Sequence, residues 1–193
     1  MNDSRLMLAR RLVLSAALFA VAGGASAVTV VIGGGAAEIA LRVGATGGTI
    51  SNVTFAPAGA TAGTGAVVLG TTNAAAGSAQ APNFAAACAA NNVRIWARAR
   101  APVAATRTAT LQVNSSGNLT SGGNSIPFTD FGWVTSGGAE IPSGNFSGSA
   151  TQTLMTFQNS NEVSVCLQFQ FANTTIYPSG AYTGQLTFNL QMP

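Results

Sequence analysis

The chain has 193 residues with eight arginines, five acidic residues and neither lysine nor histidine, for a formal net charge of +3. Three arginines lie within the first eleven residues, so the remainder is nearly neutral and lacks the dense basic surface that nucleic-acid binding requires. A Ser or Cys nucleophile activated by a histidine base is likewise excluded, because there is no histidine.

The amino-terminal segment, residues 1–27, has the order of a secretory signal peptide. It combines early arginines, the apolar run LVLSAALFAVAGGA and the small residues Ala25, Ser26 and Ala27. We expect cleavage after Ala27, which leaves residues 28–193 as one exported domain in the periplasm, at the cell surface or outside the cell. The apolar run is too short to span a membrane, and no later segment approaches the ~20 apolar residues that a span requires.

Residues 28–35 read VTVVIGGG, an apolar strand followed by three glycines. A dinucleotide-binding turn would need G-x-G-x-x-G ahead of a helix, but Glu38 stands at the third glycine position and EIALRV alternates like a strand. We therefore interpret the glycines as a turn or hinge. The strand Val28–Ile32 could pair within its own chain or complete the sheet edge of a neighbouring copy as a donor or swapped strand.

The rest of the chain alternates between apolar and polar residues with a period of two, and clusters of Gly, Asn, Ser and Pro interrupt it. This pattern predicts an all-β antiparallel sandwich, Ig-like or jelly-roll-like, with turns at Asn114–Asn118, Ser121–Asn124, Ser136–Gly138 and Pro178–Gly180. Besides Val28–Ile32, the expected strands are Glu38–Val43, Ile50–Phe55, Ala66–Gly70, Val93–Ala99, Ala109–Val113, Phe131–Thr135, Gln152–Phe157, Val163–Phe171 and Tyr182–Met192.

An Ala-rich segment, Thr71–Ala90, has no clean period and is expected to form a long surface loop or one short helical turn. It contains Cys88, and the only other cysteine is Cys166. In an oxidising compartment this pair predicts one disulfide. Cys166 shares its strand face with Gln168 and Gln170, so the bridge is expected to hold the loop on the outside of a sheet.

The segment Arg94–Arg100 places Arg94, Trp96, Arg98 and Arg100 on one face of a strand. Guanidinium groups around an indole could form a groove for an anionic glycan or a single strand. The plainer interpretation, which we favour, is an exposed sheet face where arginine stems cover the indole, or a contact between subunits.

The acidic residues offer little for catalysis or metal binding. Glycoside hydrolysis needs two facing carboxylates, and Asp130 and Glu140 could approach each other across a hairpin. Solubilising charges at strand ends are the more common role for such residues. Clustered acids of the calcium-loop type are missing from the sequence. We therefore expect no enzyme, no metal and no cofactor.

The segment Tyr177–Phe188, YPSGAYTGQLTF, resembles the closing P-x-G-x-Y-x-G/D-x-[LV]-T strand of secreted bacterial sandwich subunits, including fimbrial and spore-coat-U-type proteins. Residues from Ile126 through Trp133 and Ile141–Gly144 also resemble uncharacterised exported proteins. The resemblance covers about a third of the chain, and the cysteine placement departs from the fimbrial pattern. It implies an Ig-like sandwich used as a building block outside the cell.

Together these features predict an exported structural or surface protein, pilin-like or coat-like, that associates with its own copies or with other surface proteins. The alternative is a secreted carbohydrate-binding or adhesive module that uses the face of Arg94, Trp96, Arg98 and Arg100.

Overall fold

The computed structural model describes residues 38–44, 52–73, 88–101, 106–159 and 161–193. The predicted signal peptide, the strand Val28–Ile32 with its glycines, and most of the Ala-rich segment lie outside these ranges. In the described part of the chain, two principal antiparallel sheets and two small two-stranded sheets account for the strands. The predicted all-β sandwich is therefore confirmed.

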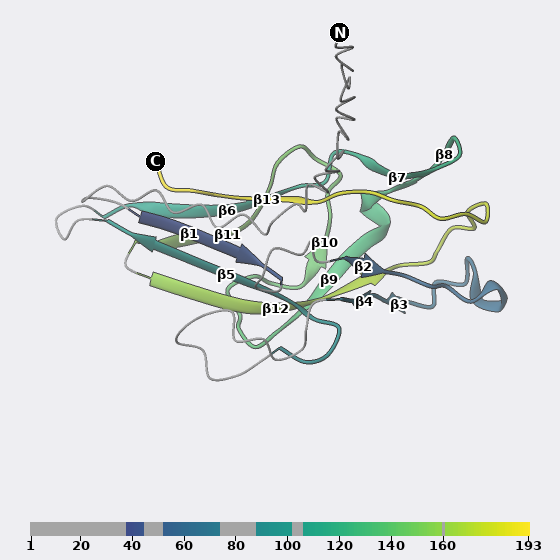
Figure 1. Ribbon diagram of the computed structural model, residues 1–193, viewed down its shortest axis with the longest axis horizontal. Coiled ribbons are helices and arrows are strands. Elements are labelled where there is room, and N and C mark those ends of the chain that lie inside the picture. The colour runs from purple at the N-terminus through teal and green to yellow at the C-terminus, as the bar shows by residue number, and fades with distance from the viewer. Residues whose placement is uncertain (1–37, 45–51, 74–87, 102–105, 160) are drawn as a thin grey trace, which may run out of the picture.

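The larger sheet contains the strand that carries the arginine face. Its order is β1 (Glu38–Val43), β5 (Val93–Arg100), β12 (Asn161–Phe171), β9 (Phe131–Ser136) and β10 (Gly144–Asn145), and β3 (Val68–Leu69) pairs with the end of β12 that β5 does not reach. The smaller sheet has the order β11 (Gln152–Gln158), β6 (Thr108–Asn114) and β13 (Thr187–Gln191). In Figure 1, β6 and β13 run along one side of the molecule and β5 and β12 along the other.

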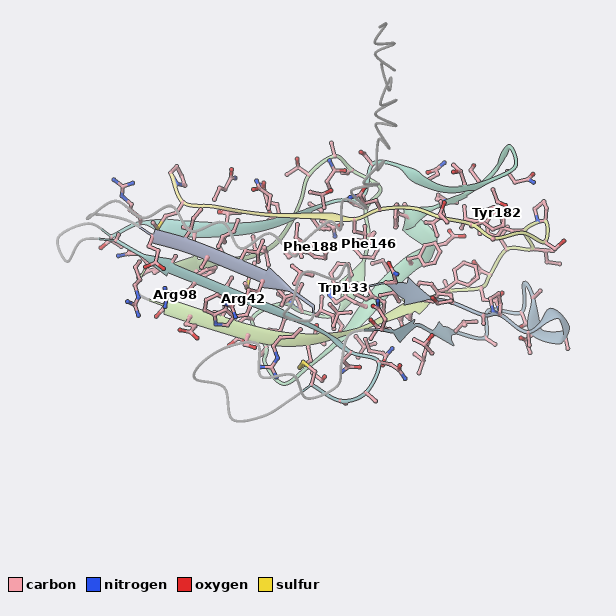
Figure 2. The ribbon with its side chains drawn as sticks, viewed as in Figure 1. Arg42, Arg98, Trp133, Phe146, Tyr182 and Phe188 are labelled. Atoms are coloured by element: carbon pink, nitrogen blue, oxygen red, sulfur yellow. A yellow bond between two sulfur atoms is a disulfide. The ribbon has the colours of Figure 1, made fainter. Side chains whose placement is uncertain are left out.

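The core lies between the inner faces of these two sheets and follows the period of two. β5 alternates buried apolar residues with the arginine face, and β6 buries Ala109, Leu111 and Val113 in the same way. An aromatic group fills the centre, where Phe146 lies 4.9 Å from Trp133 and 6.0 Å from Phe169 between ring centroids (Figure 2). Such aromatic pairs add stabilisation beyond the apolar area that they bury.

One hairpin occurs where the sequence indicated only turns. β7 (Asn118–Ser121) and β8 (Asn124–Pro127) flank Gly122 and Gly123, whose φ angles of 53° and 90° suit a two-residue hairpin turn. Both strands consist mostly of polar residues, so the alternation of apolar and polar residues did not predict them. The two-stranded sheet of β2 (Val53–Thr54) and β4 (Thr71–Thr72) likewise places a short strand at the start of the expected loop.

The carboxyl-terminal strand is shorter than predicted, because β13 begins at Thr187 rather than at Tyr182. Gly184 explains the break: a Cβ there would lie 2.8 Å from Leu119 Cγ and 3.1 Å from Phe128 Cζ. The chain is therefore pressed against β7 at this point. It makes one isolated bridge between Thr183 and Thr120 before it joins β6.

Asn173 organises the loop that contains the 3-10 turn η1 (Gly59–Thr61). Its side chain is only 1% exposed; its Nδ2 donates to the carbonyls of Thr61 (2.8 Å) and Ala66 (3.2 Å), and its Oδ1 accepts from Gly63 N–H. Asn173 also has a φ of 51°, a conformation that Asn tolerates better than most residues. One side chain thus holds a loop more than a hundred residues away in the sequence.

We expect Asn173→Ala to lower the free energy of unfolding by about 2 kcal/mol, because two loop carbonyls lose the donor that the buried Asn173 side chain supplies and alanine is strained at positive φ. Urea unfolding of the variant measures the loss. Asn173→Gly is the matched control, since it removes the same hydrogen bonds but adopts the left-handed conformation freely. A glycine variant less stable than the alanine variant would contradict the role assigned to the backbone conformation.

Candidate functional site: the outer face and β1 edge of the large sheet

The register of three strands assembles the predicted face on the outside of the large sheet. β5 pairs with β1 on one side, where Arg42 lies opposite Trp96 and Ala40 opposite Arg98. On the other side it pairs with β12, where Cys166, Ser164 and Glu162 lie opposite Arg94, Trp96 and Arg98. All four predicted residues therefore share one face, as their spacing indicated.

Trp96 is covered rather than displayed. Its side chain is 4% exposed and packs with Ala40 in a small cluster separate from the main core. The Cζ atoms of Arg42 and Arg98 lie 5.5 and 5.8 Å from the ring centroid, within the range of cation–π attraction. Trp96 Nε1 donates a 2.7 Å hydrogen bond to Glu162 Oε1. The ring is thus packed and hydrogen-bonded within the protein, and its faces are not open for a sugar to stack on.

The arginines of this face differ in their surroundings. Arg98 forms an ion pair with Glu38, and both side chains are about one quarter exposed. Arg94 is 8% exposed and donates to Ser164 Oγ at 3.3 Å. Arg100, at the end of β5, is exposed. Figure 2 labels Arg42 and Arg98, which lie along β1 and β5.

The charges of the face are mixed, with four arginines and two glutamates drawn from three strands. The sequence interpretation identified the β5 residues but missed Arg42, Glu38 and Glu162 as members. The alternation of EIALRV and EVSVC places these three on one side of their strands. What it could not provide was the strand order, which makes β1 and β12 the neighbours of β5.

The predicted disulfide joins Cys88 to Cys166, with Cα atoms 5.6 Å apart. Cys166 lies on the outer face of β12, opposite Arg94 on one side and Ser136 on the other. The prediction from strand parity is confirmed: the bridge attaches to the outside of the large sheet and does not cross the core.

The edge of the large sheet at β1 is the second notable feature of this region. Within the described residues, β1 pairs with β5 alone, and its inner-face residues Ile39, Leu41 and Val43 are only partly buried. β13, at the edge of the small sheet, lies next to β1 and carries the partly buried Phe188 (Figures 1 and 2). Two sheet edges with half-buried apolar side chains therefore meet along one side of the sandwich.

The carboxyl-terminal motif has a structural explanation in its own contacts. Tyr182 O–H donates to the Pro178 carbonyl at 2.9 Å, which closes the turn that contains Gly180. A Cβ on Gly180 would lie 2.7 Å from Ser121 Oγ, so the turn is pressed against β7. The tyrosine and glycines of the motif thus serve the packing of this segment on the β7–β8 hairpin.

The two acids considered for hydrolysis do not face each other. The backbone carbonyl of Asp130 accepts a hydrogen bond from Ala172 N–H. Glu140 lies by Gly138, next to the Ser164 carbonyl. Eight residues along β12 separate these two places, or about 26 Å. A glycosidase pair would need a separation of roughly 5–9.5 Å.

Asp130 has a different partner, because its Oδ2 accepts a 2.6 Å hydrogen bond from Tyr177 O–H. Burial raises the pKa of Tyr177, and the hydrogen bond to Asp130 and the charge of that carboxylate raise it further. Among the residues that the structure describes, no group of three or more His, Cys, Asp or Glu side chains could hold a metal ion.

No protein-family model, curated protein or solved structure matches the chain. In the described ranges, no helix has the length and apolar character needed to cross a membrane. The fold and the site thus define the chain as an all-β, disulfide-linked sandwich protein.

Proposed function

We propose that the chain is an exported structural or surface subunit, pilin-like or coat-like, that acts through protein–protein assembly. The observation that carries the proposal is the side of the sandwich where the edge strands β1 and β13 meet, each paired with one strand among the described residues, and leave Ile39, Leu41 and Phe188 half-buried. A sheet edge offers a row of backbone donors and acceptors to another chain, and half-buried apolar side chains beside it reward that pairing.

Two further features support this role. The disulfide is typical of proteins that fold in an oxidising compartment, as expected for an exported chain. The arginine face supports internal packing better than ligand capture, because Trp96 is enclosed by Arg42, Arg98 and Glu162. The alternative of a carbohydrate-binding or adhesive module would have to use the guanidinium groups around that ring instead of the ring itself.

Residues 28–35 supply one possible source of strand for such assembly. VTVVI has the apolar, β-branched character of a strand, and Gly33–Gly35 could allow it to leave its own domain. In the proposed role this segment adds to the edge of a neighbouring copy.

The proposal is tested on residues 28–193, purified with the disulfide formed. We expect oligomers by analytical ultracentrifugation and ordered filaments or layers by electron microscopy. Removal of residues 28–35 should abolish the extended assemblies, whereas replacing the five exposed residues Val67, Leu69, Val134, Ile176 and Arg100 one at a time with serine should not. A protein that stays monomeric at every concentration, with or without residues 28–35, would refute the structural role.

A further inference from the structure

The edge strand β1 is self-complementary, and this points to a specific partner. We propose that two copies of the chain pair β1 with β1 antiparallel about a two-fold axis at Ala40, which joins two large sheets into one continuous sheet. This contact rests on the proposed function, because it presupposes that copies of the chain assemble. It specifies one of the contacts between them. The two-fold contact is isologous, so it closes on itself and needs no other surface.

The backbone of β1 presents the groups that this pairing requires. Gly44 N–H donates to the Arg94 carbonyl at 2.8 Å, and the register continues without a shift to Glu38 opposite Arg100. In an antiparallel ladder, alternate residues exchange hydrogen bonds with the same neighbour. The even-numbered residues of β1 therefore bond to β5, and the N–H and C=O groups of Ile39 and Leu41 point away from it.

In the proposed register, Ile39 lies opposite Leu41 of the second copy, and Leu41 lies opposite its Ile39. Each of these pairs exchanges two backbone hydrogen bonds, which uses the outward groups of both residues. The side chains of both lie on the inner face and are only partly buried in the single chain. Pairing places each apolar side chain beside another, and this contact removes further apolar surface from water.

On the outer face, the same register places Glu38 opposite Arg42 of the second copy, and Arg42 opposite its Glu38. Opposite charges directly across two strands stabilise a pair, and like charges destabilise it. Ala40 lies at the axis, where a small side chain leaves room for the close approach of the two strands. Glu38 and Arg42 thus lie two residues to either side of Ala40 and carry opposite charges, so β1 is complementary to an antiparallel copy of itself.

Other registers lose this match. A slip of two residues places Arg42 or Glu38 opposite Ala40, so no opposite charges meet between the described residues. A slip of one residue moves the apolar side chains of one strand to the charged face of the other. The sequence of β1 therefore favours one register about Ala40.

Both charged side chains are already held near the required place. Glu38 contacts Arg98, and Arg42 lies over the Trp96 ring. Side chains that are ordered before association lose less conformational freedom when they bind. The contact is nevertheless small, because five residues from each chain bury less surface than a standard interface. We expect a dimer that is weak in isolation and is reinforced when copies are concentrated.

Charge reversal provides the first test, using the full mature chain with its disulfide. Glu38→Arg places two arginines opposite each other, and Arg42→Glu places two glutamates opposite each other, in both halves of the contact. Each variant alone should dimerise about ten-fold more weakly or worse by sedimentation equilibrium. An equal mixture of the two variants should form a heterodimer, because every pair in it is again of opposite charge.

Two controls separate this result from damage to the fold. The double variant with Glu38→Arg and Arg42→Glu should recover the dimer, and Arg107→Glu, a charge reversal at an exposed residue outside the large sheet, should leave it unchanged. Thermal melts establish that each variant is folded. Single variants that dimerise as well as the unaltered chain, or a mixture that forms no heterodimer while both variants are folded, would overturn the proposal.

The register itself is tested by crosslinking. Ala40→Cys places two thiols at the axis, where Cα atoms of a facing pair lie about 4.5 Å apart, within the range of a disulfide. Because the native cysteines are both in the disulfide, the new thiol should form a covalent dimer under mild oxidation. Val43→Cys, about 20 Å from its copy in this register, should not. Equal crosslinking at both positions would reject the register.

The outcome also distinguishes this contact from the wider role. If the charge variants still form filaments or layers and the dimer step is unaffected, the two-fold contact is wrong and the structural function stands. If removal of residues 28–35 abolishes the dimer while β1 is intact and the protein is folded, that segment occupies the edge and the proposed contact is wrong. If the two-fold dimer forms and is the largest species under all conditions, the contact is right and the filament or coat function fails.

Discussion

Replacing both Cys88 and Cys166 with alanine is expected to lower the free energy of unfolding by about 4 kcal/mol while the sandwich stays folded. The disulfide closes a segment of 78 residues, and the chain-entropy model assigns a stabilisation of this size to so long a loop. The bridge attaches to the outer face of β12 and leaves the packed inner faces intact. The fold should therefore survive at a lower stability.

The measurement has two parts, urea unfolding for the stability and limited proteolysis for the location of the change. New cleavage should appear first between Asn73 and Ala90, with the β-sheet circular dichroism unchanged. Reduction of the unaltered protein is the control, because it should reproduce the loss, whereas the alanine variant should not respond to the reductant. If the β-sheet circular dichroism is lost at the same time as the loop becomes cleavable, the disulfide instead holds the two sheets together.

Trp96→Ala is expected to lower the free energy of unfolding by about 3 kcal/mol, which is a large loss for a residue outside the main core. The substitution removes a nearly fully buried ring, leaves Glu162 without its indole donor and takes away the surface over which Arg42 and Arg98 lie. Trp96→Phe should cost only about 1 kcal/mol, because it keeps an aromatic face for the arginines and loses mainly the hydrogen bond.

Denaturant unfolding of the two variants measures this difference, and a glycan array run beside it bears on the function. The structural role predicts a clear loss of stability and no specific glycan signal in any of the three proteins. A stable Trp96→Ala protein that loses specific glycan binding shown by the unaltered chain would instead favour the adhesive module. Arg100→Ala serves as the control for the exposed end of the face and should change the stability little.

Assembly through sheet edges would involve two neighbouring edges on one side of the sandwich. The proposed two-fold contact uses the edge of β1, and β13 beside it pairs with β6 alone among the described residues, so its other edge is a candidate for strand addition. A closed dimer contact and an open-ended strand addition are different kinds of symmetry, and only the second extends without limit. A subunit with both contacts could form paired filaments or sheets.

Several features of the fold could be predicted from single segments. The alternation of Val163–Phe171 predicted a strand, its inner face and the outward position of Cys166, all of which are confirmed. Likewise, the spacing of Arg94, Trp96 and Arg98 placed them on one face. These successes share a cause, because side chains of a strand alternate regardless of what lies next to it.

Where alternation failed, contacts from distant residues were the reason. Leu154 and Met155 are adjacent and both buried, because the register between β11 and β6 shifts between Thr153 and Met155. Asn173, a polar residue outside the predicted strands, is buried and hydrogen-bonded to the loop that contains Thr61 and Ala66. In neither case does a local pattern specify the partner.

By its sequence alone, this protein is determined to be all-β, with one disulfide on an outer face and an arginine-rich strand beside an indole. The tertiary structure decided that the indole is enclosed by Arg42, Arg98 and Glu162. It also places β1 at the edge of the large sheet as far as the described residues extend, with Glu38 and Arg42 on either side of Ala40. The physical reason is that alternation fixes which way a side chain points, whereas strand order and register, which fix what it meets, depend on the packing of the whole chain.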